Sequence, residues 1–214
     1  MIYILLAILT SVFLLSIFKL LPKYNVNTFH AIIINYLVAA TTGFVFSENK
    51  IDFSLVAETP WLWICLPLGL LFIGIFYLIS LTAQKISIAA ASVANKMSVV
   101  IPVLFSIIFI GEKLSALKLI GILLALIAVY FTNKKANKES DVSKKLLWLP
   151  VFVFIGSGLI DTSINAAQTY LFTLPVHSEL FSIGTFASAF MIGICILIFQ
   201  LFKKSGAKLE FKSI

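Results

Sequence analysis

Apolar residues follow one another along this chain in long runs that polar positions seldom interrupt. Seven such runs are separated by short segments rich in Lys, Asp, Glu, Asn and Pro. The runs cover residues 2–21, 28–46, 61–84, 88–110, 116–132, 146–171 and 176–202. A helix needs about 20 apolar residues to cross the hydrocarbon core of a bilayer. The pattern therefore predicts an all-α integral membrane protein, a polytopic bundle of seven transmembrane helices.

A membrane β-barrel and a soluble domain both disagree with this pattern. Barrel strands alternate lipid-facing apolar and lumen-facing polar residues, whereas residues 66–81 show no such alternation. Charged residues make up 12% of the chain, against about 25% in soluble domains. Too few charged side chains remain to cover a water-facing surface, which supports the membrane assignment.

The positions of the basic residues predict how the helices are oriented. All are Lys, and most lie in the connections between runs, so orientation explains the net charge of +7 better than a nucleic-acid partner does. Three, Lys50, Lys113 and Lys118, fall on one side of the membrane. Twelve fall on the other: Lys19, Lys23, Lys85, Lys134, Lys135, Lys138, Lys144, Lys145, Lys203, Lys204, Lys208 and Lys212. Because Lys-rich loops are cytoplasmic, we expect a multi-pass protein of the cytoplasmic membrane with its N-terminus outside.

The charge bias reverses between the two ends of the chain. The hairpin at 2–46 has a basic connection and is followed by an acidic loop, whereas the hairpin at 146–202 has a connection without Lys and is followed by a basic tail. Two five-span units inserted in opposite orientations would produce this reversal, and inverted repeats recur in secondary transporters. We expect a first five-helix repeat at 1–133, a basic cytoplasmic linker at 134–145 and a partial second repeat at 146–214.

Residues 81–135 contain an ordered set of elements. Small residues from Ala89 to Ala94 precede Pro102 in the middle of a run, Gly111-Glu112 follows, and Gly121 lies in the next run. The segment reads LTAQKISIAAASVANKMSVVIPVLFSIIFIGEKLSALKLIGILLALIAVYFTNKK. In this order and spacing, the elements resemble those of EamA-type transporters of the drug/metabolite transporter superfamily. The resemblance extends less sharply to the other runs.

The resemblance implies ten spans in two inverted five-span halves, with a substrate cavity near the membrane midplane. Relative to that pattern, we expect the chain to lack the last three spans, so that the second repeat is incomplete. The implied function is secondary transport, as a permease or exporter, of a small-molecule metabolite by alternating access. The alternative is an incomplete or regulatory membrane subunit without transport activity, working as a homodimer or with a partner that supplies the missing spans.

Lys96 is the most informative polar residue inside an apolar run. An ionisable side chain within a membrane span costs on the order of 3 kcal/mol or more, and it normally faces a cavity or a partner. The alternative is that its long side chain reaches the membrane surface by snorkelling. In the functional interpretation, Lys96 attracts an anionic group of the substrate or titrates during transport.

Asp161 is the acidic counterpart of Lys96. Ser157, Asp161, Asn165 and Gln168 are spaced four, four and three apart, so they share one helical face. This stripe either lines the cavity, where Asp161 binds a cationic group or carries a proton, or it joins helices through hydrogen bonds and a Lys96–Asp161 pair. Further cavity candidates are Asn35 and Asn95, with Tyr77 and Gln84 behind them.

Other residues of the runs suggest packing and helix geometry. Pro102 lacks an N–H and is expected to free the carbonyl of Ser98, giving a fixed kink or a gating hinge. Gly121 and Ala125 are expected to let helices approach closely, and Glu112 is expected to lie at a helix end. Cys65 and Cys195 are expected to be small buried hydrophobes.

The sequence lacks the residue spacings that enzymes and metal proteins use. His30 and His177 are isolated, so neither a metal site nor a nucleophile–base arrangement is indicated. A Gly-rich phosphate loop before a helix is also missing, which disfavours an ATP-driven pump. We therefore expect no enzymatic activity, no cofactor and no metal. The identity of the substrate, the direction of transport and the coupling ion stay open.

Overall fold

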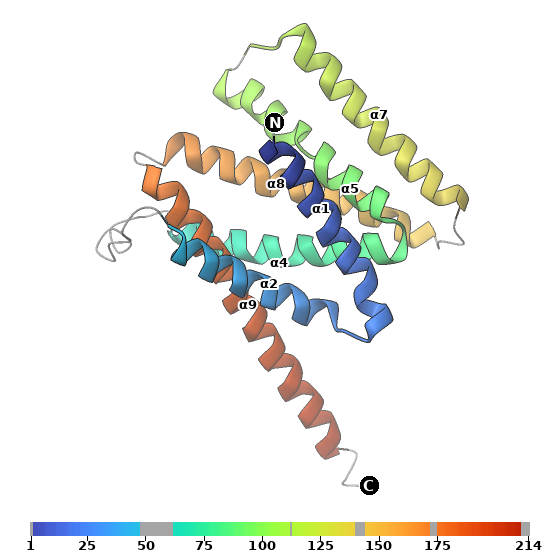
Figure 1. Cartoon of the computed structure of the whole chain (residues 1–214), viewed down its shortest axis with the longest axis vertical. Helices are drawn as coiled ribbons and strands as arrows, with labels where there is room; N and C mark the ends of the chain where they lie inside the picture. The colour runs from blue at the N-terminus through green and yellow to red at the C-terminus, as the bar shows by residue number, and fades with distance from the viewer. Residues whose placement is uncertain (1, 48–61, 112, 140–143, 172–174, 211–214) are drawn as a thin grey trace. The chain divides into compact units, whose positions relative to one another are not determined.

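The computed structural model describes residues 2–47, 62–111, 113–139, 144–171 and 175–210, and these form helices joined by short connections without any strand (Figure 1). The elements are α1 (Ile2–Leu20), η1 (Leu21–Tyr24), α2 (Thr28–Val45), α4 (Leu62–Lys85), α5 (Ile88–Met97), α6 (Val100–Phe105), η2 (Ser106–Ile110), α7 (Ala116–Glu139), η3 (Lys144–Trp148), α8 (Leu149–Tyr170) and α9 (Pro175–Glu210). This all-helical architecture confirms the predicted fold class.

Six stretches of the described chain are long and apolar enough to cross a membrane. They are Leu5–Tyr24, Thr28–Val45, Trp63–Lys85, Ile88–Ile110, Leu146–Tyr170 and His177–Phe202. The apolar part of α7, Ala116–Phe131, is shorter. The protein is thus a multi-pass membrane protein, and the predicted runs coincide closely with these helices.

Short polar side chains and left-handed residues determine where several helices begin and end. The Ser87 hydroxyl accepts a hydrogen bond from the Ala90 N–H at 3.0 Å and caps the start of α5. Asn25 ends η1 with φ 55°, and Gly111 ends η2 with φ 77°. A left-handed backbone at a helix end favours Gly because it has no Cβ. Gly111 of the predicted Gly-Glu element therefore stops a helix, while Glu112 lies outside the described residues.

Contacts divide the chain into two compact units. The first contains Met1–His30 and Gly74–Tyr170, and the second contains Ala31–Ile73 and Leu171–Ile214. The division passes through α2 and α4, so each of these helices contributes residues to both units. The predicted inverted repeat concerns insertion topology instead, and it stays a prediction.

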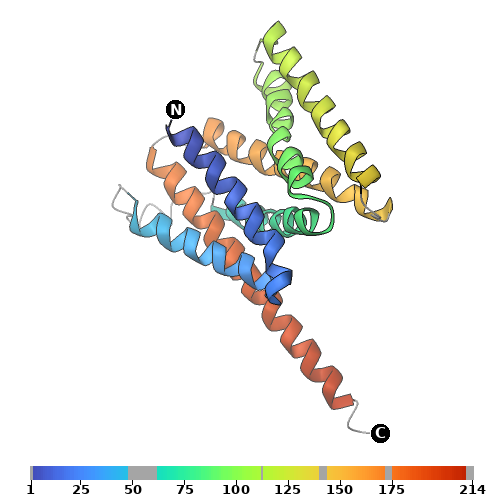
Figure 2. The same ribbon diagram turned by 45° about the vertical axis from the view of Figure 1, so that its right-hand side comes forward.

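In the first unit, α5 packs against α1, α7 and α8, and α6 packs against α8 (Figures 1 and 2). Two glycines of α8 make the close packing possible. A Cβ on Gly158 would lie 2.2 Å from Ile101 Cδ1, and a Cβ on Gly156 would lie 2.0 Å from Ile75 Cδ1. Small residues let membrane helices approach closely, so these glycines bring α8 against α6 and α4.

Gly121 does not have the packing role predicted for it. It is exposed, and a Cβ built on it would meet no described atom within 4 Å. Ala125, four residues later, is 8% exposed and packs with Val100 and Ile122. The prediction was wrong for Gly121 because α7 turns its buried face toward α5 at Ile122 and Ala125, and Gly121 lies outside that face.

Gln84 repairs a hydrogen bond that Pro22 removes from the end of α1. Pro22 has no N–H, so it cannot donate to the carbonyl four residues earlier, which is that of Phe18. The Gln84 Nε2 amide donates to this Phe18 carbonyl at 2.8 Å, and it also contacts Thr28 Oγ1 at 2.9 Å and Ser80 Oγ at 3.1 Å. A side chain from another helix thus satisfies the carbonyl, as membrane interiors require. Gln84 is accordingly a structural residue instead of a cavity candidate.

Replacing Gln84 by Leu is expected to destabilise the protein by about 1–3 kcal/mol, because the Phe18 carbonyl loses its donor. The loss is expected to shrink in the Pro22→Ala background, where the new N–H can donate to that carbonyl. Thermal unfolding in detergent, followed by circular dichroism, measures this coupling. Gln168→Leu, at an exposed position, is the matched control. Independent, additive effects of the Pro22 and Gln84 substitutions would contradict the repair.

The second unit is built from most of α2, the first half of α4, and α9. The Tyr36 hydroxyl donates to the Phe72 carbonyl at 2.9 Å, and the Tyr36 ring stacks on Phe186 with centroids 6.1 Å apart. Phe72 meets Phe186 edge to face at 5.7 Å. Tyr36 is 1% exposed, so its hydroxyl needs this partner. These aromatic rings join the three helices.

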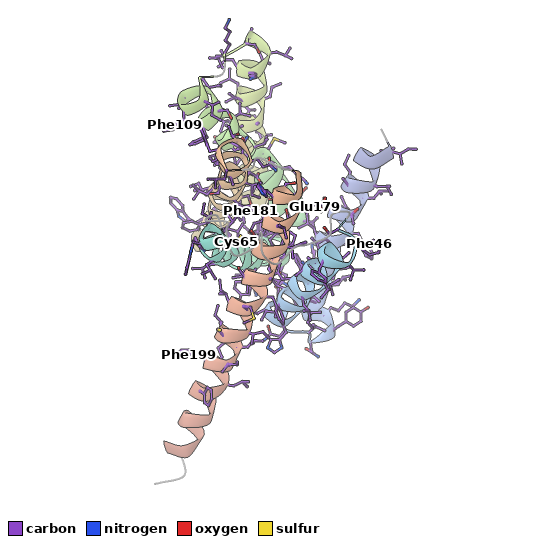
Figure 3. The ribbon with its side chains drawn as sticks, turned by 90° about the vertical axis from the view of Figure 1, so that its left-hand side faces the viewer. Phe46, Cys65, Phe109, Glu179, Phe181 and Phe199 are labelled. Carbon is purple, nitrogen blue, oxygen red and sulfur yellow. The ribbon has the colours of Figure 1, made fainter. Side chains whose placement is uncertain are left out.

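Cys65 and Cys195 are not joined in a disulfide, and they differ in burial. Cys65 on α4 is buried, and its Sγ donates to the carbonyl of Phe181 on α9 at 3.8 Å (Figure 3). Cys195 is exposed, so the expectation of burial is confirmed for Cys65 and wrong for Cys195. On a membrane protein, an exposed apolar side chain can face lipid, which explains the difference.

Candidate functional site

The predicted fourth span, 88–110, is interrupted by a two-residue helical turn in the structure. α5 ends at Met97, a turn at Ser98 and Val99 follows, and α6 begins at Val100. Beyond α6, the π-helix η2 continues to Ile110. Ser98 and Val99 keep right-handed helical backbone angles, so the chain is tightened and kinked here and not unwound. The kink lies beside the ionisable Lys96, which makes this part of the first unit the candidate for a functional site.

The kink lies one turn before Pro102, as a missing N–H predicts. The expectation that the Ser98 carbonyl would be free was wrong, because the backbone tightens locally. The Ile101 N–H donates to the Ser98 carbonyl at 2.9 Å, and the Val103 N–H donates to the Val99 carbonyl at 3.2 Å. The i→i−3 bond of Ile101 replaces the bond that Pro102 cannot make, at the cost of regular helix geometry.

The Lys96 ammonium lies at the depth of the middle of α1. Its Nζ donates to the Ser11 hydroxyl at 3.5 Å. Ser11 has nine residues of α1 on either side, because the helix runs from Ile2 to Leu20. A snorkelling Lys would carry its charge to a helix end, whereas this Lys holds it halfway along a neighbouring apolar helix. The geometry therefore disagrees with snorkelling, because the exposed Lys96 side chain holds its charge within the span.

Asp161 on α8 lies across from the kink. The Ser98 hydroxyl and the Lys96 ammonium both lie close enough to its carboxylate to interact with it electrostatically. No direct ion pair joins the ammonium to the carboxylate in the described structure, and both residues are exposed. The structure therefore brings together Lys96, Ser98 and Asp161, with both charges free of the direct pairing that would neutralise them.

Ser157 lies one turn before Asp161 on the same face of α8. Its side chain is 5% exposed, and its Oγ has no hydrogen-bond partner among the described atoms. Gly156 and Gly158, which flank it, lie against α4 and α6 respectively, so Ser157 is directed between those two helices. A buried hydroxyl without a partner is unusual and marks a position where a bound molecule can supply one.

The other residues predicted to line the cavity make no side-chain hydrogen bond to Lys96 or Asp161 in the described structure. Asn95 precedes the kink, and its carbonyl accepts the Ser98 hydroxyl at 2.6 Å. Asn165 is bonded within α8, because the Thr169 hydroxyl donates to its carbonyl at 2.9 Å. Gln168 is exposed at the same end of α8. Asn35 belongs to the other compact unit, so it is not grouped with Lys96 here.

Two contributors to the site were not predicted, Ser11 and the Ser98 hydroxyl. Ser11 lies in a run where hydroxyls commonly bond to their own helix, as its Oγ does with the Ala7 carbonyl at 2.7 Å, so nothing in the sequence marks it. Ser98 lies four residues before Pro102, and this spacing pointed to its carbonyl but not to its side chain. Over the described residues, no group of three or more His, Cys, Asp and Glu forms a metal-binding cluster.

Comparisons with known proteins agree with the resemblance seen in the sequence. Residues 1–134 match the EamA-like transporter family. An uncharacterized protein of Haemophilus influenzae strain Rd is 28% identical over 205 residues, which cover 92% of this chain and 67% of that protein. No solved structure matches the chain.

Proposed function

Because the chain belongs to the EamA-like transporter family, we propose that it is a secondary transporter that moves a small metabolite across the cytoplasmic membrane by alternating access. The observation that carries this proposal is the position of Lys96 and Asp161. Opposite charges lie beside the kinked helix without a direct bond between them, and the Lys96 ammonium reaches Ser11 in the middle of α1. Such charges are costly in a membrane and typically mark a substrate or ion pathway.

In this proposal Lys96 attracts an anionic group of the substrate and Asp161 a cationic group or a proton. Ser157 offers a hydroxyl that has no partner among the described atoms. A kinked or discontinuous span beside a cavity recurs in secondary transporters. Asn95, Asn165 and Gln168 are proposed to line the same cavity.

Counterflow with the purified 214-residue chain in liposomes tests the proposal. Liposomes are loaded with one unlabelled metabolite, and uptake of the same labelled metabolite is followed over a panel of amino acids, sugars, anions and organic cations. We expect saturable uptake above protein-free liposomes for at least one compound, because a carrier exchanges its substrate without net flux. If protein with full helical content takes up none of these compounds, transport by this chain alone would be contradicted.

The second candidate is an incomplete or regulatory membrane subunit without transport activity. The alignment supports it, because a third of the Haemophilus influenzae relative lies outside the matched region. Repeating counterflow after co-reconstitution with a polypeptide corresponding to the unmatched third of that relative distinguishes the two functions. Uptake that appears only in the mixture would favour the subunit.

The proposed orientation, with the N-terminus outside, has a direct measurement. In a chain whose Cys65 and Cys195 are replaced by Ala, Lys113→Cys is expected to react with a membrane-impermeant maleimide in intact cells. Lys23→Cys is expected to react only after the cells are permeabilised, because its loop is cytoplasmic by the Lys bias. The reverse labelling pattern would place the N-terminus inside.

A further inference from the structure

α2 and α9 pack against each other in a reciprocal pattern. A Cβ on Gly43 would lie 2.9 Å from Ile183 Cγ1, and a Cβ on Gly193 would lie 2.6 Å from Ile33 Cγ1. Each helix thus places a Gly against an Ile of the other, once toward each end of the contact. Because later residues of α2 meet earlier residues of α9, the two helices run antiparallel.

One shift along the chain exchanges these two Gly–Ile pairs. Ile33 and Ile183 are 150 positions apart, and so are Gly43 and Gly193. In a contact between units related by a two-fold axis, residue i meets j where j meets i. The α2–α9 contact has this property. In the predicted inverted repeat, α2 and α9 are the second helices of their repeats, so they are the helices that such an axis would relate.

Aromatic rings occupy the centre of the contact, between the two Gly–Ile pairs. Tyr36 and Phe186 are again 150 positions apart, and their rings stack with centroids 6.1 Å apart. Phe72 of α4 meets both rings edge to face. The shift therefore exchanges the central contact and the two flanking contacts among themselves.

One contact at the end of the helix pair has no such image. The Ser47 hydroxyl donates to the Glu179 carboxylate at 2.6 Å, one helical turn beyond the nearer Gly–Ile pair. The same shift gives Phe29 and Leu197 as the image of this pair, and two apolar side chains cannot form such a bond. A hydrogen bond to a carboxylate is among the stronger ones. It therefore stabilises the state in which this end of the pair is closed.

Alternating access by inverted repeats is largely a rocking of one repeat against the other, in which equivalent helices exchange surroundings. A contact whose image is present at the same time is kept in both end states, whereas a contact without an image is made in one state only. We propose that the α2–α9 contact centred on Tyr36 and Phe186 is the pivot of this motion, and that the Ser47–Glu179 bond is a latch that closes one end. The role in transport rests on the proposed function, but the motion of the two helices can be measured without transport.

Distances between paired spin labels test the pivot, measured by double electron–electron resonance on the purified chain in detergent with both cysteines replaced by Ala. Labels at Phe46 and Ser182 report on the latched end, and labels at Val38 and Met191 report on the centre; all four positions are exposed. Glu179→Gln is expected to raise the population with a wider latched end about fivefold, the ratio between a charge-assisted and a neutral hydrogen bond. The distance at the centre should not change.

Thr41→Val is the matched control, because this hydroxyl of α2 bonds to the Leu37 carbonyl of its own helix at 2.8 Å. It should leave both distance distributions unchanged. Widening at the centre equal to that at the end, or no widening of the latched end in Glu179→Gln, would overturn the proposal. Each variant is first checked for helical content, and Ser47→Ala replaces Glu179→Gln where the latter does not fold.

Disulfides connect the pivot to transport, with each oxidised chain compared with the same chain after reduction. Cys residues introduced at Gly43 and Ile183 tie the helices close to the centre, and their disulfide should leave counterflow at the level of the reduced chain. Cys residues at Ser47 and Glu179 lock the latched end, and their disulfide should abolish counterflow until a reductant opens it. Equal effects of the two disulfides on a transporting chain would overturn the assignment. The expected spin-label response in a chain without counterflow would uphold the pivot while contradicting transport.

Discussion

Counterflow by the Lys96→Gln and Asp161→Asn chains is expected to fall by about tenfold or more, equivalent to at least about 1.4 kcal/mol of lost substrate interaction. Each substitution removes one charge and leaves the other without its electrostatic partner within the span. If the charged side chain contacts the substrate in every state of the transport cycle, the uptake rate should be reduced at every substrate concentration. Initial rates in proteoliposomes, normalised to the amount of inserted protein, give the comparison.

The double variant separates a transport role from a packing role. If Lys96 and Asp161 only hold the bundle together, removing both charges restores a neutral interior, and the transport rate should recover. In the proposed function the double variant stays as inactive as the single ones. Lys23→Gln, on the exposed connection after α1, is the matched control and should transport normally. Undiminished transport by the double variant would remove the assigned role of both residues.

Gly69→Ala is expected to be the most destabilising single-methyl addition among the helical glycines of the structure. A Cβ on Gly69 would lie 2.7 Å from the backbone N of Ala189 and 3.0 Å from the backbone C of Ser188. Backbone atoms cannot rotate away as the end of a side chain can, so α4 and α9 must separate. Overpacking of this kind costs about 1–3 kcal/mol, and we expect a value near the upper end.

Gly74→Ala, five residues later on the same helix, is the matched control. Nothing described lies within 4 Å of a Cβ at Gly74, and Ala is a better helix former than Gly by about 0.5–1 kcal/mol. Its thermal midpoint in detergent should therefore stay level or rise, while that of Gly69→Ala falls. A fall of equal size in both variants would show that helix propensity or lipid contact, instead of packing on α9, decides the outcome.

The helices were predictable because a bilayer leaves few alternatives for an apolar chain. Runs of about 20 apolar residues must form helices there, and the observed elements follow the runs closely. The exact packing was not predictable, since Gly69, Gly74, Gly121 and Gly158 look alike in sequence. Their different surroundings come from which face each helix turns to its neighbours, and α7 in particular has little amphipathic pattern to indicate that face.

The charged residues of the candidate site could be predicted from the sequence, but the side chains that they contact on other helices could not. Lys96 and Asp161 stand out because charge is rare in the runs, and Pro102 marked the neighbourhood of the kink. The hydroxyls of Ser11 and Ser98 gave no such signal, because Ser is common in membrane helices and usually bonds to its own backbone. Which of them reaches another helix depends on the packing of elements far apart in sequence, such as those that carry Ser11 and Lys96, 85 positions apart.

The bond between Gln84 and the end of α1 also bears on how the chain is made. The Phe18 carbonyl receives its donor from a residue 66 positions later, so the first helix leaves the ribosome before that donor has been synthesised. Until α4 follows it into the bilayer, water or lipid headgroups must satisfy this carbonyl. We therefore expect insertion of the third hydrophobic segment to complete the hydrogen bonding of the first, so that the early spans mature together in the bilayer.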